Sequence, residues 1–203
     1  TLAADGFAVA VNYSSSAEEA EILVADIKAN GGNALAVKCN VANSVEVENM
    51  FNTIENQLGN INVLVNNAGV MKLATLAQSN DELFDSQIAI NLKGTFNTLR
   101  LAAERVVNGG RIINLSTSVV GLKLETYGVY AATKSAVETM SAILAKELRG
   151  KSITVNTVAP GPTATNLFLD GKPAELIERL AKMNPMERLG TPEDIANVIA
   201  FLA

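Results

Sequence analysis

The chain has 203 residues, which is long enough for one sizeable hydrophobic core, so we expect a single domain over residues 1–203. Hydrophobic residues make up 48% and charged residues 18%, and the net charge of −5 is scattered without any basic run, which argues against a nucleic-acid partner. The absence of histidine excludes imidazole acid–base chemistry, the Ser-His-Asp hydrolase and most zinc sites, and we expect no metal site.

The single cysteine, Cys39, lies inside an apolar run and cannot form an intramolecular disulfide, as is usual in a reducing compartment. No apolar run approaches the length that crosses a membrane, and no signal peptide is visible at the N-terminus. We therefore expect a cytoplasmic protein without membrane contact.

Short apolar runs alternate with amphipathic segments in the first third of the chain. Residues 1–6 are typical of the tail of a helix closed by Gly6. The expected strands are residues 7–11, 34–39 and 61–65. Between them, apolar residues recur at helical spacing from Ala20 to Ile27 and from Val47 to Leu58, and glycine follows each run.

The same alternation continues to the end of the chain. A long helix is expected over about 81–107, and Gly109-Gly110 separates it from a strand at 111–115. The helix that carries Tyr130 is expected to reach about residue 148. A strand at 153–158 follows, and two helices close the sequence, one around 173–183 and one opened by Thr191.

Alternating strands and helices, with strands that are apolar almost throughout, indicate a parallel sheet covered on both faces. We therefore predict a doubly wound α/β fold. In such a sheet, ligands bind beyond the carboxyl ends of the strands. The unusual polar and glycine residues fall at those ends, as Asn66-Asn67-Ala68-Gly69, Ser116-Thr117-Ser118 and Pro160-Gly161.

Tyr130 and Lys134 are four residues apart, so they lie on one face of their helix. An ammonium near a phenol lowers the phenol pKa from its usual value of about 10, which would make Tyr130 a proton donor or acceptor near neutrality. The other two tyrosines have alanine at this spacing. A solvated helix face is the alternative interpretation, and the polar strand ends favour the functional one.

These residues resemble the short-chain dehydrogenase/reductase family. Within it, they look most like the 3-oxoacyl-acyl-carrier-protein reductases and the sugar dehydrogenases. The resemblance rests on Asn67-Ala68-Gly69, Asn91, Ser118, Tyr130-x-x-x-Lys134, and Pro160-Gly161 with Thr165. It implies a Rossmann-type fold and hydride transfer between a nicotinamide cofactor and a carbonyl or secondary alcohol, such as a 3-oxoacyl thioester.

The resemblance also implies a role for each site residue. Tyr130 would exchange a proton with the substrate oxygen, and Lys134 would lower the Tyr130 pKa and bind the nicotinamide ribose. Ser118 would hydrogen-bond the substrate oxygen, with Ser116 as the rival because it shares a strand face with Ser118. Asn91 would distort its helix and hold a water that relays protons to Lys134.

A dinucleotide would be held by the strand ends. The implied contacts near the nicotinamide and pyrophosphate are Asn67, Ala68, Gly69, Tyr130, Lys134, Pro160, Gly161, Thr163 and Thr165. Asn12-Tyr13-Ser14 contains no acid to bind a ribose 2′-hydroxyl, so we prefer NADP, with NAD possible. Asn40-Val41 would lie beside the adenine.

The family's first strand with its glycine-rich loop, and its last strand, are absent from this sequence, which is therefore expected to be a piece of a longer chain. Residues 7–11 and 61–65 would then lack a neighbouring strand. The resemblance further implies a substrate lid over about 163–189 and a homotetramer built on helices 81–107 and 128–148.

Two other classes of function stay open. A catalytically silent nucleotide-binding or assembly protein of the same fold is the main alternative, although an intact Asn91, Ser118, Tyr130 and Lys134 set argues against it. A hydrolase on a similar sheet is disfavoured by the absence of histidine and of a Gly-x-Ser-x-Gly turn.

Overall fold

The computed structural model describes residues 1–203. Strands and helices alternate as expected. The strands are β1 (Val9–Tyr13), β2 (Ala34–Lys38), β3 (Ile61–Asn66), β4 (Val106–Leu115) and β5 (Thr154–Val158). The helices that form the layers are α1 (Ala17–Ala29), α2 (Ser44–Leu58), α3 (Asp81–Gln87), α4 (Thr95–Arg105), α6 (Gly128–Glu147), α8 (Ala174–Lys182) and α9 (Pro192–Leu202). Short turns of helix occur at η1 (Leu76–Gln78), α5 (Val119–Leu122) and α7 (Asn166–Leu169).

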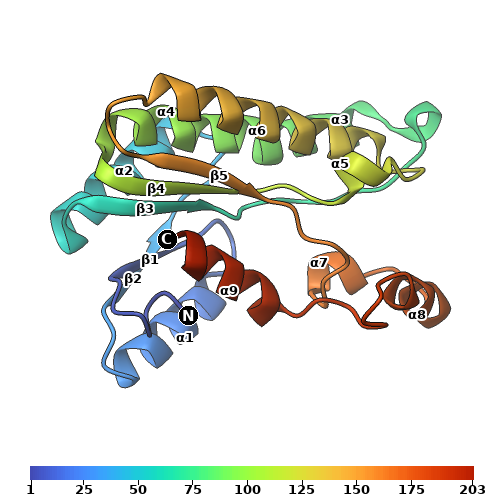
Figure 1. Cartoon of the computed structure of the whole chain (residues 1–203), viewed down its shortest axis with the longest axis horizontal. Helices are drawn as coiled ribbons and strands as arrows, with labels where there is room; N and C mark the ends of the chain where they lie inside the picture. Colours follow the sequence, from blue (N-terminus) through green and yellow to red (C-terminus); the bar gives the residue numbers. More distant parts are fainter.

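All strand pairs are parallel, and they form two separate pieces of sheet. β1 pairs with β2, and β4 lies between β3 and β5. Helices cover both faces of the three-stranded piece: α4 and α6 lie on one side, and α9 packs against β4 and β5 from the other (Figure 1). The predicted doubly wound α/β fold is confirmed.

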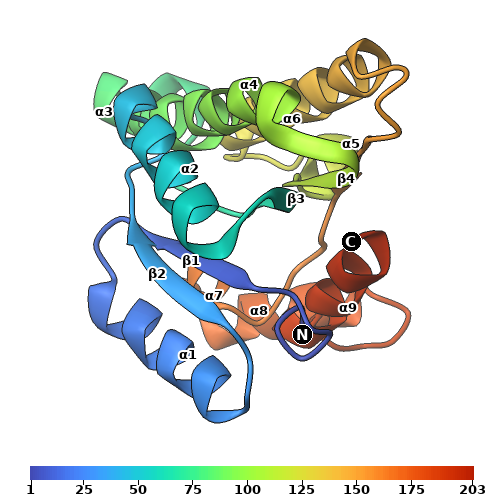
Figure 2. The ribbon, with the colours of Figure 1, turned by 90° about the vertical axis from the view of Figure 1, so that its left-hand side faces the viewer.

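The two pieces of sheet are separated between β1 and β3 (Figure 2). A cavity of about 440 Å³ lies there, and both strands line it, Ala8 and Ala10 from one side and Val63 and Val65 from the other. Each of the two strands has a hydrogen-bonded neighbour on one edge only. This agrees with the expectation that these strands lack a neighbour.

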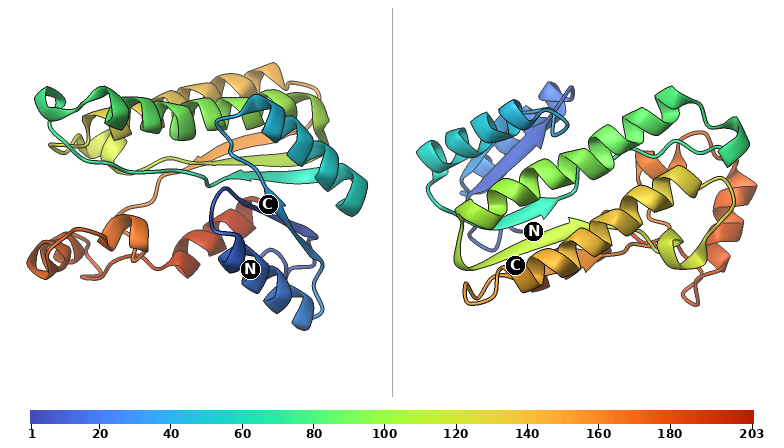
Figure 3. Two further views of the ribbon diagram at one scale, coloured as in Figure 1. Left: turned by 180° about the vertical axis from the view of Figure 1, so that it is seen from behind. Right: turned by 90° about the horizontal axis from the view of Figure 1, so that it is seen from above.

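The main core lies between the three-stranded piece and its covering helices. Val47 and Phe51 of α2, Ala102 of α4 and Ile112 of β4 are almost completely buried in it. Seen from above, α4 and α6 run side by side over the sheet (Figure 3). Cys39 joins this core, and burial raises the pKa of its thiol to about 11, so it is an inert packing residue.

Three local predictions were wrong. Residues 1–6 form turns, and the first strand begins at Val9 instead of residue 7. The expected helix over 81–107 is divided into α3, a π-helical segment η2 (Ile88–Gly94) and α4, and its last two residues open β4. Helical periodicity does not show the division, because the π-helical turn depends on side-chain contacts with another segment. No helix combines the length and the apolar character needed to cross a membrane.

Candidate active site

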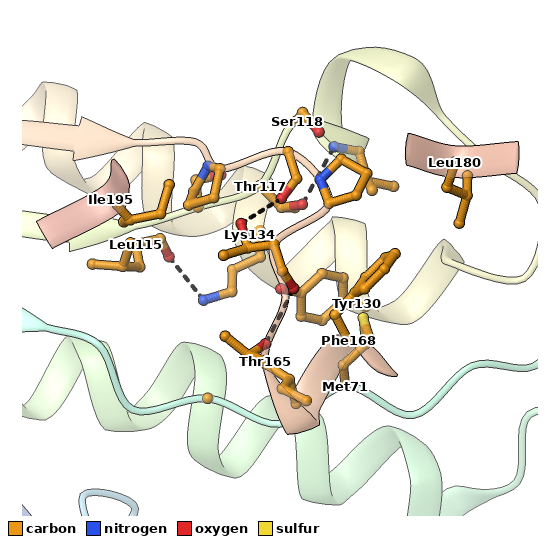
Figure 4. A pocket seen from close by; sticks show the side chains of 18 of the residues that line it. Met71, Leu115, Thr117, Ser118, Tyr130, Lys134, Thr165, Phe168, Leu180 and Ile195 are labelled. Carbon is orange, nitrogen blue, oxygen red and sulfur yellow. Dashed lines mark hydrogen bonds between the residues drawn. The ribbon is translucent and has the colours of Figure 1, made fainter. Parts of the chain in front are cut away.

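A cavity of about 750 Å³ opens where β3, β4 and β5 end (Figure 4). Asn67, Gly69 and Met71 line it after β3, residues 115–118 after β4, and residues 160–163 after β5. Tyr130 and Lys134 reach the same cavity from α6. The predicted convergence of the strand ends with the Tyr130 helix is therefore present in the structure.

Tyr130 and Lys134 share one face of α6 and are both buried. The Lys134 ammonium nitrogen lies 5.9 Å from the centre of the Tyr130 ring. It donates a 2.8 Å hydrogen bond to the main-chain oxygen of Leu115, the last residue of β4. The predicted pair thus faces the cavity together, and the lysine also ties α6 to the end of the central strand.

The titration behaviour of this pair differs from the expectation. Burial raises the pKa of Tyr130, the neighbouring Tyr127 raises it further, and a hydrogen bond with the Thr117 side chain lowers it only in part. Burial also lowers the pKa of Lys134 to about 8. The expected depression of the Tyr130 pKa by Lys134 was wrong, because removal of the phenol from water is the largest cause of the shift and Lys134 is not among the groups that move this pKa.

Three hydroxyl side chains follow β4, and they have different surroundings. Ser116 donates a 2.6 Å hydrogen bond to the Glu138 carboxylate of α6. Thr117 is buried, and its side chain lies close enough to the Tyr130 phenol to lower the phenol pKa. Ser118 lines the cavity, but its main chain has turned into the helical conformation, and its N–H donates to the Pro160 oxygen at 2.9 Å. In Figure 4, Thr117 is drawn between Ser118 and Tyr130.

Thr117 is therefore a second candidate hydroxyl near the phenol, beside the predicted Ser118, which also lines the cavity. In an extended strand, Ser116 and Ser118 would point to the same face. They do not follow this rule here, because the strand ends at Leu115. The threonine hydroxyl donates and accepts hydrogen bonds as the serine hydroxyl does, so Thr117 could have been named as a candidate from the sequence. Tyr127, which also lines the cavity and stacks edge-on against Tyr130, was missed as well.

Asn91 is completely buried in the π-helical segment, so the expected distortion of its helix is confirmed. Its amide nitrogen donates to the Val70 oxygen and its amide oxygen accepts from the Val70 N–H, both at 2.8 Å. A weaker contact joins the amide nitrogen to the Thr133 hydroxyl at 3.3 Å. The side chain thus holds the segment after β3 and braces it against α6.

Gln87 makes the same kind of contact one helical turn earlier, and the sequence analysis missed it. Its amide accepts from the Lys72 N–H at 3.3 Å and donates to the Lys72 oxygen at 3.1 Å, and the side chain is fully buried. The Gln87 side chain therefore binds the main chain of residue 72, and the Asn91 side chain binds the main chain of residue 70. Met71, between them, contributes to the cavity wall.

The predicted lid segment is joined at its two ends. Thr163 pairs with Gly190, the Ala164 N–H donates to the Gly190 oxygen at 2.8 Å, and the Gly190 N–H donates to the Pro162 oxygen at 2.9 Å. Thr163 and Thr165 both line the cavity. Residues 163–190 thus form a loop that carries α7 and α8 (Figure 1), and residues of both helices line the cavity.

The remaining predicted cofactor residues lie at the ends of β1 and β2, outside the lining of the larger cavity. The Asn12 amide donates to the oxygens of Val37 and Cys39, at 3.2 and 3.0 Å. The Asn40 N–H donates to the Glu46 carboxylate at 2.8 Å. Tyr13 and Ser14 adjoin Asn12, Val41 is buried next to Asn40, and Ala68 lines the smaller cavity.

The glycines leave room for a ligand along these strand ends. A Cβ at Gly69 would lie 3.4 Å from the Asn91 amide oxygen and 3.6 Å from the Lys134 nitrogen, so glycine keeps the space beside the lysine open. A Cβ at Gly161 would meet no atom within 4 Å. Main chain that is free of side-chain bulk near a buried lysine, with amide and hydroxyl groups around it, is suited to binding a dinucleotide.

Comparisons with known proteins point to one family. A family model described as enoyl-(acyl carrier protein) reductase matches residues 1–203. A short-chain type dehydrogenase/reductase of Picea abies is 45% identical, and the alignment covers all of this chain and 78% of the relative. An NADPH-dependent aldehyde reductase-like protein of Arabidopsis thaliana and a 3-oxoacyl-acyl-carrier-protein reductase of Staphylococcus aureus are each 40% identical, with 80% and 82% of their lengths covered.

Solved structures agree. A short-chain dehydrogenase/reductase from Serratia marcescens superimposes with a TM-score of 0.93 at 33% identity, covering all of this chain and 82% of that one. A blue fluorescent protein from a metagenomic library, in complex with NADPH, superimposes with a TM-score of 0.92 at 32% identity, over the same shares of the two chains.

Proposed function

Because the chain belongs to the short-chain dehydrogenase/reductase family, we propose that it reduces a carbonyl compound to an alcohol with NADPH, or catalyses the reverse oxidation. The observation that carries this proposal is the buried Tyr130–Lys134 pair at the common carboxyl edge of β3, β4 and β5. NADPH is supported by the NADPH-dependent aldehyde reductase relative, by the NADPH complex of a structural neighbour, and by the lack of an acid at Asn12-Tyr13-Ser14.

The cofactor supplies the hydride. The nicotinamide half would be held by the open backbone at Asn67, Ala68 and Gly69, by Lys134 at the ribose, and by the loop after β5 with Pro160, Gly161, Thr163 and Thr165. Asn12, Tyr13, Ser14, Asn40 and Val41 would flank the adenosine half at the ends of β1 and β2.

Tyr130 would donate a proton to the substrate oxygen during reduction. A pKa raised by burial keeps its phenol protonated near neutrality, which suits a proton donor. Lys134, whose pKa is about 8, can release and rebind a proton near neutrality, and it would pass a proton on to the Tyr130 phenol after each turnover. Asn91 would maintain the π-helical turn and a water in this relay, a part that its contacts with Val70 and Thr133 support.

A second hydroxyl would hold the substrate oxygen as negative charge develops on it. The effect of the Thr117 side chain on the Tyr130 pKa favours Thr117 for this part over the predicted Ser118. Ser118 would then contribute to the wall of the cavity. Ser116 is unsuited because its hydroxyl is already bound to Glu138.

The segment 163–189 would act as the substrate lid, and aldehydes, ketones and 3-oxoacyl thioesters are the candidate substrates, in line with the two reductase relatives. We further propose a homotetramer formed through the outer faces of α4 and α6. Phe96 and Ile143 on these helices are about half exposed in the single chain, which supports a covered face in an assembly.

The test is the loss of NADPH absorbance on mixing purified protein with a panel of aldehydes, ketones and 3-oxoacyl thioesters. Turnover of at least one carbonyl by the parent protein, and its loss in Tyr130→Phe, would support the proposal. NADPH binding without turnover of any carbonyl or alcohol would instead favour a silent nucleotide-binding protein.

A further inference from the structure

The walls of the active-site cavity carry almost no charge. Of the 28 residues that line it, Lys134 is the only one with an ionisable acid or basic group other than tyrosine. The apolar part of the wall comes from the segment after β3, from the turn after α5, and from α7 and α8. Its members include Met71, Leu124, Phe168 and Leu180, and Ile195 and Ile199 of α9 complete it.

Lys134 does not serve as a clamp for an anionic substituent. Its nitrogen is bound to the Leu115 oxygen next to the Tyr130 ring, where the reacting carbonyl has to lie. The substituents of the substrate would instead point toward Phe168 and Met71, which Figure 4 shows beside Tyr130. No acidic or basic side chain lines the cavity beside these two residues, so an anionic substituent would lose water against an apolar wall.

The cations around the mouth of the cavity are already engaged. Lys123 donates to the Val120 oxygen at 2.8 Å. Lys172 donates to the Phe168 oxygen at 2.5 Å, and its nitrogen lies 4.6 Å from the centre of the Phe168 ring without lining the cavity. Lys182 is paired with Glu178 at 2.6 Å, and Arg188 with Asp194 at the same distance. Arg179, the other cation of residues 163–190, is exposed on α8 and does not line the cavity.

From this wall and these pairings we propose that the substrate is a neutral carbonyl compound with an apolar body, and that the site discriminates against the same carbonyl carrying a carboxylate or phosphate. This inference rests on the proposed function and specifies the substrate of the same site. A neutral body of moderate size also fits the cavity volume of about 750 Å³, which it would share with the nicotinamide.

The experiment compares matched pairs of substrates at fixed NADPH. Ethyl acetoacetate is paired with acetoacetate, and ethyl levulinate with levulinate. We expect kcat/KM to be at least about tenfold higher for the neutral member of each pair, because an anion in the cavity would lie without a partner. Equal values within a pair would overturn the inference and leave the proposed function standing. No turnover with these four, while another neutral carbonyl of the panel is reduced, would overturn the inference alone, and no turnover with any carbonyl of the panel would overturn both.

Two methionines of the same segment provide a matched pair of variants. Met183 lines the cavity mouth and is 63% exposed, whereas Met186 is 68% exposed and does not line it. Met183→Lys should raise kcat/KM for acetoacetate about threefold, the effect of one exposed charge pair, and Met186→Lys should not. If kcat/KM for acetoacetate rises as much in Met186→Lys as in Met183→Lys, general attraction of anions, and not the apolar wall, sets the preference for neutral substrates.

Discussion

The Lys134 ammonium donates a 2.8 Å hydrogen bond to the main-chain oxygen of Leu115, at the residue where β4 ends. This contact places a cation inside the protein and within 5.9 Å of the Tyr130 ring centre. Burial lowers the pKa of Lys134 to about 8, so the folded chain binds this proton more weakly than the unfolded chain does.

Lys134→Met should change how stability depends on pH. Between about pH 8 and the ordinary lysine pKa of 10.5, the unfolded chain keeps a proton that the folded chain has released, so the wild-type free energy of unfolding should rise with pH relative to the variant. Urea denaturation of both proteins at pH 7.5 and 9.5 measures the difference. Lys146→Met, at an exposed lysine of the same helix, is the control. Parallel pH dependences of the wild type and Lys134→Met would contradict this account.

Tyr130→Phe should reduce kcat by at least about 100-fold, the usual contribution of a general acid, and leave the NADPH dissociation constant nearly unchanged. Stopped-flow turnover and NADPH fluorescence titration give the two quantities. Tyr127→Phe is the matched control, because Tyr127 lines the same cavity and its ring lies 6.4 Å from that of Tyr130. Parent-like turnover in Tyr130→Phe would remove the tyrosine from the mechanism.

Thr117→Val keeps the shape of the side chain and removes its hydroxyl, so kcat should fall about 100-fold if this group holds the substrate oxygen. Thr117→Ser should restore most of the activity, since it restores the hydroxyl. Ser118→Ala should have the smaller effect. If Ser118→Ala proves the more damaging change in steady-state kinetics, the role returns to Ser118.

Gln87→Met should raise KM for the carbonyl substrate more than it lowers kcat. The change frees both backbone groups of Lys72 and so loosens the wall at Met71, with about 1–3 kcal/mol of lost stability from the unpaired groups. The NADPH dissociation constant should stay unchanged, which separates this effect from general unfolding. Gln57→Met, at an exposed site on α2, is the control. A uniform loss of cofactor binding and kcat would argue against a role specific to this wall.

Phe96→Asp should convert the proposed homotetramer to smaller species, because it places a charge on the half-exposed outer face of α4. Size-exclusion chromatography with light scattering measures the mass. Ile22→Asp changes a comparably exposed residue of α1 and should leave the mass unchanged. A parent protein that runs as a monomer would refute the predicted assembly directly.

Much of this site could be predicted because it depends on local order. Period-2 and period-3.6 patterns identify the strands and helices, and a parallel sheet brings all carboxyl ends to one edge. The four-residue spacing places Tyr130 and Lys134 on one face of α6, whatever the helix packs against. The alternating fold, the location of the site and this pair therefore follow from short-range sequence order.

Other properties depend on contacts between distant segments. The Tyr130 pKa rises because β4 and its neighbours bury the phenol, and no spacing along the helix reveals that burial. The side chains of Thr117 and Ser118 do not follow strand alternation, because the chain leaves the extended conformation after Leu115. Gln87 holds Lys72 across 15 residues. The sequence alone determined which segments meet at the carboxyl edge of the sheet. The tertiary structure decided what each group can do there, because desolvation and side-chain direction arise only when the segments pack together.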